Sequence, residues 1–115
     1  MTQQLIFGIG LFTIVHVLGW WCTNAQFIQG WTGKQALILG CLLSIPTTLA
    51  AYLGTRYVYD ALNGELWQVR FVAFGLSWLV FPLLTWFFLG ETMFTTKTII
   101  CTLLSLLIIY IQIRY

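Results

Sequence analysis

A single histidine lies within an apolar stretch near the start of the chain, in the sequence TIVHVLGWWCTNAQF over residues 13–27. If this stretch is helical, its polar and aromatic residues recur at three- and four-residue steps and share one face. They are Thr13, His16, Trp20, Thr23 and Asn24. An ionisable ring is costly in hydrocarbon unless it is paired, and imidazole can change its charge near physiological pH. We therefore expect His16 to face protein or water, as a titrating group or as a neutral ring that serves packing.

A second stripe lies between residues 67 and 85 and consists of Trp67, Arg70, Phe74, Ser77, Phe81 and Thr85. Arg70 brings a permanent charge and a fork of donors suited to a carboxylate or phosphate. Together the two stripes predict a substrate-binding site near the middle of the membrane, formed by His16, Trp20, Arg70, Phe74 and Ser77. The alternative for Arg70 is an interfacial arginine whose charged end reaches water, paired with Asp60 or Glu65.

The sequence contains no pattern typical of catalysis or of metal binding. One histidine, no GxSxG, no HExxH and no pair of carboxylates within an apolar run argue against an enzyme with catalytic residues. The three cysteines, Cys22, Cys41 and Cys101, are far apart and lack the spacing of metal ligands. We expect them to pack as small apolar side chains, and we expect no metal or other cofactor.

The composition is that of a membrane protein. Of 115 residues, 60% are hydrophobic and only 7% are charged, whereas charged residues make up about 25% of an ordinary soluble domain. The net charge of +2 is spread thinly and forms no basic patch. Nucleic acid is therefore excluded as a partner, and membrane lipid is expected.

Four apolar runs, over residues 5–22, 36–53, 71–89 and 98–113, are each close to the roughly 20 residues that cross a bilayer as a helix. The segments between them collect nearly all the charge. The expected fold is an all-α integral membrane domain over residues 1–115, with four transmembrane helices and short loops. An even number of crossings places both termini on one side.

The orientation of these helices is weakly determined. Arg56, Arg70 and Arg114 lie on the side of the termini, against Lys34 and Lys97 on the other side. The excess of one basic residue favours cytoplasmic termini. The near balance leaves open a second arrangement, in which the protein inserts both ways round and pairs with an inverted copy of itself.

The second apolar run carries small residues at four-residue intervals, at Ala36, Gly40, Ser44 and Thr48. Such a stripe lets the backbone of a neighbouring helix approach closely. We therefore expect Gly40, Ser44 and Thr48 to form a helix-packing surface.

The second half of the chain, from ALNGELWQVRF through FFLGETMF to IIYIQI, resembles the drug/metabolite transporter superfamily, in particular its four-helix small multidrug resistance type. The resemblance lies in the AL pair before the third helix and in the aromatic-rich exit that ends in Gly90 and Glu91. It implies an antiparallel homodimer of dual topology in a bacterial-type inner membrane. It also implies a glutamate in the first helix that binds protons and cationic substrate in turn.

By this resemblance, His16 falls where the glutamate is expected, in HVLGWWCTNAQF. A protonated histidine would repel a cation, and Arg70 falls near an aromatic position of the family's pocket. The sequence therefore predicts a small transporter or flippase-like protein that moves a neutral or anionic solute by alternating access. The alternative is an accessory subunit of a larger membrane complex that transports nothing.

Overall fold

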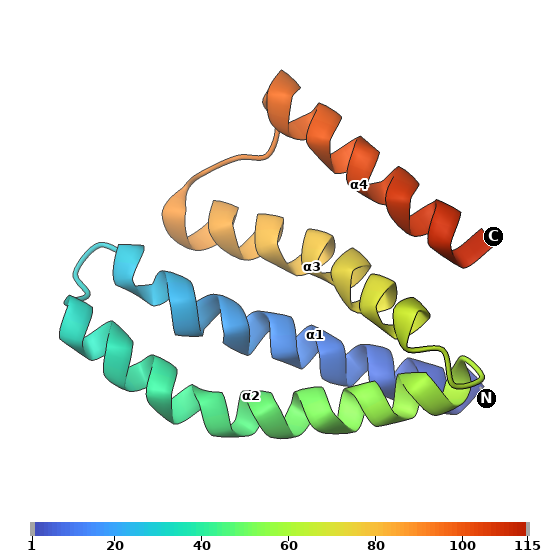
Figure 1. The fold of residues 1–115 in the computed structure, drawn as a ribbon. Helices are drawn as coiled ribbons and strands as arrows, with labels where there is room; N and C mark the ends of the chain where they lie inside the picture. The colour runs from blue at the N-terminus through green and yellow to red at the C-terminus, as the bar shows by residue number, and fades with distance from the viewer. Residues whose placement is uncertain (1, 115) are drawn as a thin grey trace.

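The computed structural model describes residues 2–114, with side chains described over residues 3–112. Over this range the chain is helical, which confirms the all-α fold expected from the sequence. The elements are α1 (Thr2–Asn24), η1 (Ala25–Phe27), α2 (Gly33–Ala61), α3 (Leu66–Leu89) and α4 (Thr96–Arg114). Successive α-helices run in opposite directions, so that α1 begins and α4 ends at the same end of the molecule (Figure 1).

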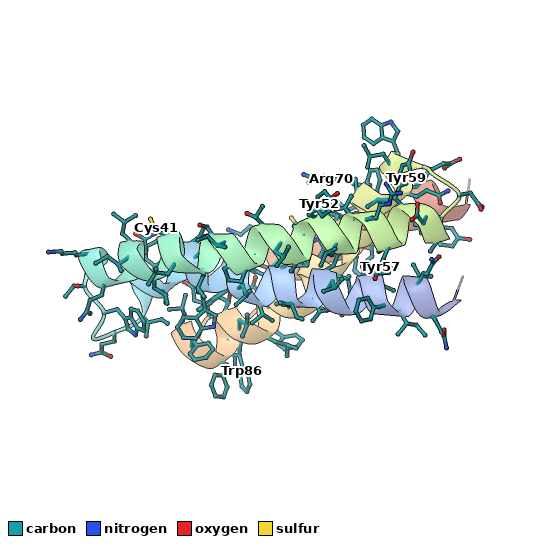
Figure 2. The ribbon with its side chains drawn as sticks, turned by 90° about the horizontal axis from the view of Figure 1, so that it is seen from below. Cys41, Tyr52, Tyr57, Tyr59, Arg70 and Trp86 are labelled. Atoms are coloured by element: carbon teal, nitrogen blue, oxygen red, sulfur yellow. The ribbon has the colours of Figure 1, made fainter. Side chains whose placement is uncertain are left out.

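Three of the helices described, α1, α2 and α3, are long and apolar enough to cross a membrane. The fourth, α4, is shorter, so that the expected set of four full-length spans is found only in part. The exposed side chains of Cys41 and Tyr52 project from one side of the molecule and Trp86 projects from the other (Figure 2). Apolar and aromatic groups thus cover the outer surface, as contact with hydrocarbon requires.

Helix α2 extends well beyond the apolar run at 36–53, and polar contacts occur near both of its ends. At its start the Thr32 side chain accepts a hydrogen bond from the backbone of Gln35, whose side chain accepts one from the backbone of Thr32. This capping box supplies partners to backbone groups that lack them in the first turn. Near its end Arg56 and Asp60, one turn apart, form an ion pair of 3.4 Å. The apolar pattern of the sequence indicates neither the capping box nor the ion pair.

The connection between α2 and α3 is a tight turn in which Asn63 and Gly64 both have positive φ, at 61° and 78°. The Gly64 amide donates to the carbonyl of Tyr59 at 2.9 Å. Because Gly adopts this backbone conformation without steric cost, the turn places the start of α3 directly beside the end of α2.

The helices form a thin layer, whose Cα atoms extend 45 × 37 × 19 Å. Helix α1 packs against both α2 and α3, whereas α2 and α3 make few contacts with each other (Figure 1). Helix α4 packs mainly on α3. Helix α1 therefore lies between α2 and α3 and contacts both of them.

The contact between α1 and α2 depends on glycines. A Cβ atom at Gly8 would lie 2.5 Å from Cγ2 of Val58, and one at Gly54 would lie 3.1 Å from the Phe12 ring. Phe12, Val58 and Val69 form the buried core at this end of the layer. Close approach of the two backbones therefore brings a residue from each of three helices into one cluster.

The residues expected to form a packing stripe on α2 have different surroundings. Gly40 lies against α1, where a Cβ atom would be 2.9 Å from the carbonyl oxygen of Cys22. Ser44 and Thr48 are exposed. Within this single chain, only Gly40 of the three lies at a close contact between helices.

Candidate functional site

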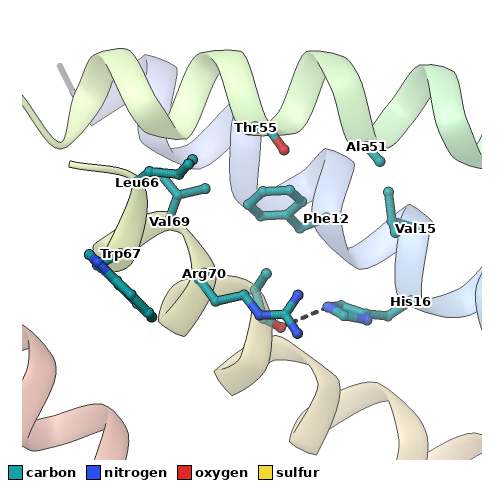
Figure 3. A pocket seen from close by; sticks show the side chains of 10 residues that line it. Phe12, Val15, His16, Ala51, Thr55, Leu66, Trp67, Val69 and Arg70 are labelled. Atoms are coloured by element: carbon teal, nitrogen blue, oxygen red, sulfur yellow. Dashed lines mark hydrogen bonds between the residues drawn. The ribbon is translucent and has the colours of Figure 1, made fainter. Parts of the chain in front are cut away.

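A cavity of about 730 Å³ lies where α1, α2 and α3 meet. Helix α1 provides its floor, and the sparse contact between α2 and α3 leaves the space between them (Figure 3). The lining residues are Phe12, Val15 and His16 of α1, Ala51 and Thr55 of α2, and Leu66, Trp67, Val69, Arg70 and Ala73 of α3. We call this space the three-helix cavity. Its size is within the range of about 300–1,000 Å³ typical of small-molecule sites.

His16 lies at the end of the three-helix cavity that is farther from the start of α3. Its Nε2 is 2.7 Å from the backbone carbonyl oxygen of Ala73 (Figure 3). A carbonyl oxygen can only accept, so Nε2 carries the hydrogen and donates it. In the neutral ring this leaves Nδ1 as an acceptor. The ring therefore joins α1 to α3 and contacts the cavity without offering it a free Nε2 donor.

Arg70 lies four residues after the first residue of α3, about 6 Å along the helix axis. Its guanidinium points into the cavity in the direction of His16 (Figure 3). Asp60, a partner considered for it, instead pairs with Arg56 at 3.4 Å. Over the described side chains, no carboxylate forms an ion pair with Arg70, and none lines the cavity. The charge of Arg70 is thus available to a ligand.

Trp20, another predicted site residue, is buried and is not among the residues that line the cavity. Its indole Nε1 donates to the hydroxyl of Thr85 at 3.0 Å. Thr85 is also buried, on α3. The indole ring of Trp20 also packs against Trp21 and Phe88. In this arrangement the indole nitrogen of Trp20 is occupied by a contact between helices.

Phe74 and Ser77 belong to a neighbouring face of α3. Phe74 is 36% exposed and its ring meets that of Trp78 edge to face, while the Ser77 hydroxyl donates to the carbonyl of Phe74 in its own helix. Neither residue lines the three-helix cavity. Of the five predicted site residues, the structure brings His16 and Arg70 together and places Trp20, Phe74 and Ser77 elsewhere.

Several lining residues were not expected from the sequence. Phe12 precedes His16 by one helical turn, a spacing that could have indicated it. Val69 and Ala73 of α3 lie beside the aromatic stripe, and their smaller side chains pack against α1 where the larger rings of that stripe do not. Thr55 follows the apolar run of the second helix, and no pattern in the sequence indicated that it would line a cavity.

Fold and cavity together describe a small helical membrane protein with one cationic, mainly apolar cavity between three helices. No metal-binding cluster of histidine, cysteine or acidic side chains occurs among the residues described. No family model, curated protein or solved structure matches the chain. Its function is therefore inferred from its own residues.

Proposed function

We propose that the chain is the protomer of a small membrane carrier of the drug/metabolite transporter type, which moves a neutral or anionic small solute by alternating access. The observation that carries this proposal is that His16 and Arg70 line the same three-helix cavity. Polar or ionisable groups within membrane spans are costly, and they commonly mark the path of a solute.

The chemistry of the cavity favours an anion or a neutral solute over a cation. Arg70 contributes a fixed positive charge, and the described lining residues include no acid to balance it. A cation would be repelled by this charge and would find no carboxylate, whereas an anion would gain a charge-assisted hydrogen bond. The remaining lining is mainly apolar, as in most small-molecule sites.

The shape of the protomer supports a pair of copies. The layer has a Cα thickness of 19 Å, and the cavity is lined by α1, α2 and α3 with no described residue of α4. A second copy would supply a further wall. The near balance of basic residues between the two ends is consistent with an inverted second copy, with α4 completing four crossings in each.

Native mass spectrometry in mild detergent and reporter fusions to the C-terminus test this arrangement. A carrier of this type is expected to give a dimer mass, with reporter signal on both sides of the inner membrane. In proteoliposomes loaded with a panel of small organic acids, solute efflux should depend on Arg70 and His16. A monomer that exports none of the panel would count against the proposal.

The second candidate is an accessory subunit of a larger membrane complex. It is favoured by the peripheral position of α4, which packs mainly on α3 and leaves large apolar side chains exposed along its length, including Leu103, Leu104 and Leu107. Co-purification at a fixed ratio with other subunits, together with a single orientation in the membrane, would support this candidate and exclude the carrier.

A further inference from the structure

We propose that the three-helix cavity binds a singly charged amphiphile, with one carboxylate at Arg70 and an alkyl or aromatic body against the apolar walls. This inference rests on the proposed function and names the class of solute for the same site. Three features of the cavity support it. They are the charge of Arg70, the hydrogen-bond donors of the lining residues, and the difference in polarity between the two ends of the cavity.

The permanent charge of the cavity is a single positive unit. Arg70 is the one lining residue with a permanent charge, and no described carboxylate pairs with it. A carboxylate matches the guanidinium in charge and can accept two parallel hydrogen bonds from it. A dianion such as a phosphate monoester would bring a second negative charge without a partner, at a cost in desolvation.

The donors of the cavity are concentrated at Arg70. The Nε2 hydrogen of His16 is already donated to Ala73, and the neutral ring offers only an acceptor at Nδ1. An acceptor does not bind a carboxylate. Thr55 adds one hydroxyl on the opposite wall. The anionic group of a solute is therefore expected to accept its hydrogen bonds from the Arg70 guanidinium and not from the His16 ring.

The direction of the Arg70 side chain gives the cavity a polar and an apolar end. The guanidinium points toward His16, so the polar groups gather at the end of the cavity that is farther from the start of α3 (Figure 3). Toward the start of α3 the lining residues are apolar or aromatic, namely Phe12, Leu66, Trp67 and Val69. A solute with its charge at Arg70 would thus place its body among apolar side chains. A compact, fully polar anion would leave these side chains without a partner.

Binding of radiolabelled 4-phenylbutyrate to the full-length protein in phosphatidylcholine nanodiscs tests the proposal at neutral pH. The matched probes are 4-phenylbutanol, 4-phenylbutylamine and 4-phenylbutyl phosphate, which keep the body and change the head group. We expect the carboxylate to bind about tenfold more tightly than the alcohol, with the amine and the phosphate weaker than the carboxylate. Equal binding of the alcohol, or preferential binding of the amine, would overturn the assignment.

Two arginine variants separate the cavity from general electrostatics. Arg70→Gln should weaken 4-phenylbutyrate binding about tenfold, and Arg70→Lys, which keeps the charge but loses the planar fork, should lie between it and the wild type. Arg56→Gln is the control, because Arg56 lies outside the three-helix cavity and pairs with Asp60. Equal losses in Arg56→Gln and Arg70→Gln would contradict a specific site. Monodisperse elution of each variant in detergent establishes that it is folded.

The source of the amphiphile is distinguished by competition. Displacement of 4-phenylbutyrate by oleate in the bilayer supports a fatty acid as the natural occupant, and retained binding in the presence of oleate supports a water-soluble aromatic acid. Binding is scored without transport, so that saturable binding without flux would contradict only the carrier. Flux of another solute without binding of 4-phenylbutyrate would contradict only the amphiphile.

Discussion

The indole nitrogen of Trp20 and the hydroxyl of Thr85 form a buried hydrogen bond of 3.0 Å between residues 65 positions apart in the sequence. With the bond from His16 to the Ala73 carbonyl, it is one of two side-chain hydrogen bonds that join α1 to α3 among the described side chains. Both donors come from the polar face of α1. The pair of contacts holds α3 against α1 on one side of the three-helix cavity, and its strength can be measured.

Trp20→Phe and Thr85→Val should each lower the free energy of unfolding by about 1 kcal/mol, because each leaves a buried polar group without its partner. The double variant should lose less than the sum of the two, since the second change removes the group that the first left unpaired. Unfolding in mixed micelles, followed by helical circular dichroism, measures the four proteins. Strict additivity would show that the bond contributes nothing.

His16→Ala should destabilise the protein by about 1 kcal/mol, because it removes the hydrogen bond from His16 to the Ala73 carbonyl that joins α1 to α3. Thr13→Val is the matched control, since the Thr13 hydroxyl donates its hydrogen bond at 2.9 Å to Ile9 in its own helix and not to α3. The melting temperature in detergent is the measurement. A larger loss in the Thr13 variant than in the His16 variant would contradict the role assigned to the imidazole.

Gly8→Ala should destabilise the contact between α1 and α2 by about 1–3 kcal/mol, because the added methyl group overlaps Val58 and meets the α2 backbone. Gly10→Ala is its control in the same helix, where nothing lies within 4 Å of the new Cβ. Alanine is favoured over glycine within a helix, so this control should be neutral or stabilising by about 0.5–1 kcal/mol. Chemical unfolding compares the two, and equal effects would argue against a close approach at Gly8.

Within the predicted packing stripe, Gly40→Ala should lower the melting temperature, because the new Cβ would lie 2.9 Å from the Cys22 carbonyl oxygen. Ser44→Ala and Thr48→Ala should leave the fold of the protomer unchanged, since both side chains are exposed. If the exposed pair instead contacts a second copy, these two variants should reduce the dimer fraction in native mass spectra without changing the helical content. Unfolding of either variant would place its side chain in the protomer core.

The class of the protein and the existence of its helices could be predicted from the sequence. Hydropathy is a local property, and an apolar run in a chain with few charges must satisfy its own backbone hydrogen bonds in lipid. The ends of the helices could not be read from hydropathy in the same way. The capping box at Thr32 and the ion pair of Arg56 with Asp60 lie in the segments of α2 outside the apolar run, which hydropathy does not assign to the helix.

The sequence by itself determined that His16 and Arg70 are the unusual residues of this chain, because a lone imidazole and a near-membrane guanidinium are costly without a partner. Only the tertiary structure decided which residues they meet. His16 bonds to a backbone carbonyl, which every residue possesses and which therefore leaves no mark in the sequence. Arg70 lines the cavity beside Val69 and Ala73, which belong to or pack against the core cluster shared with Phe12 of α1. The contacts between helix surfaces determine which residues line the cavity. The spacing of residues along a single helix does not reveal these contacts.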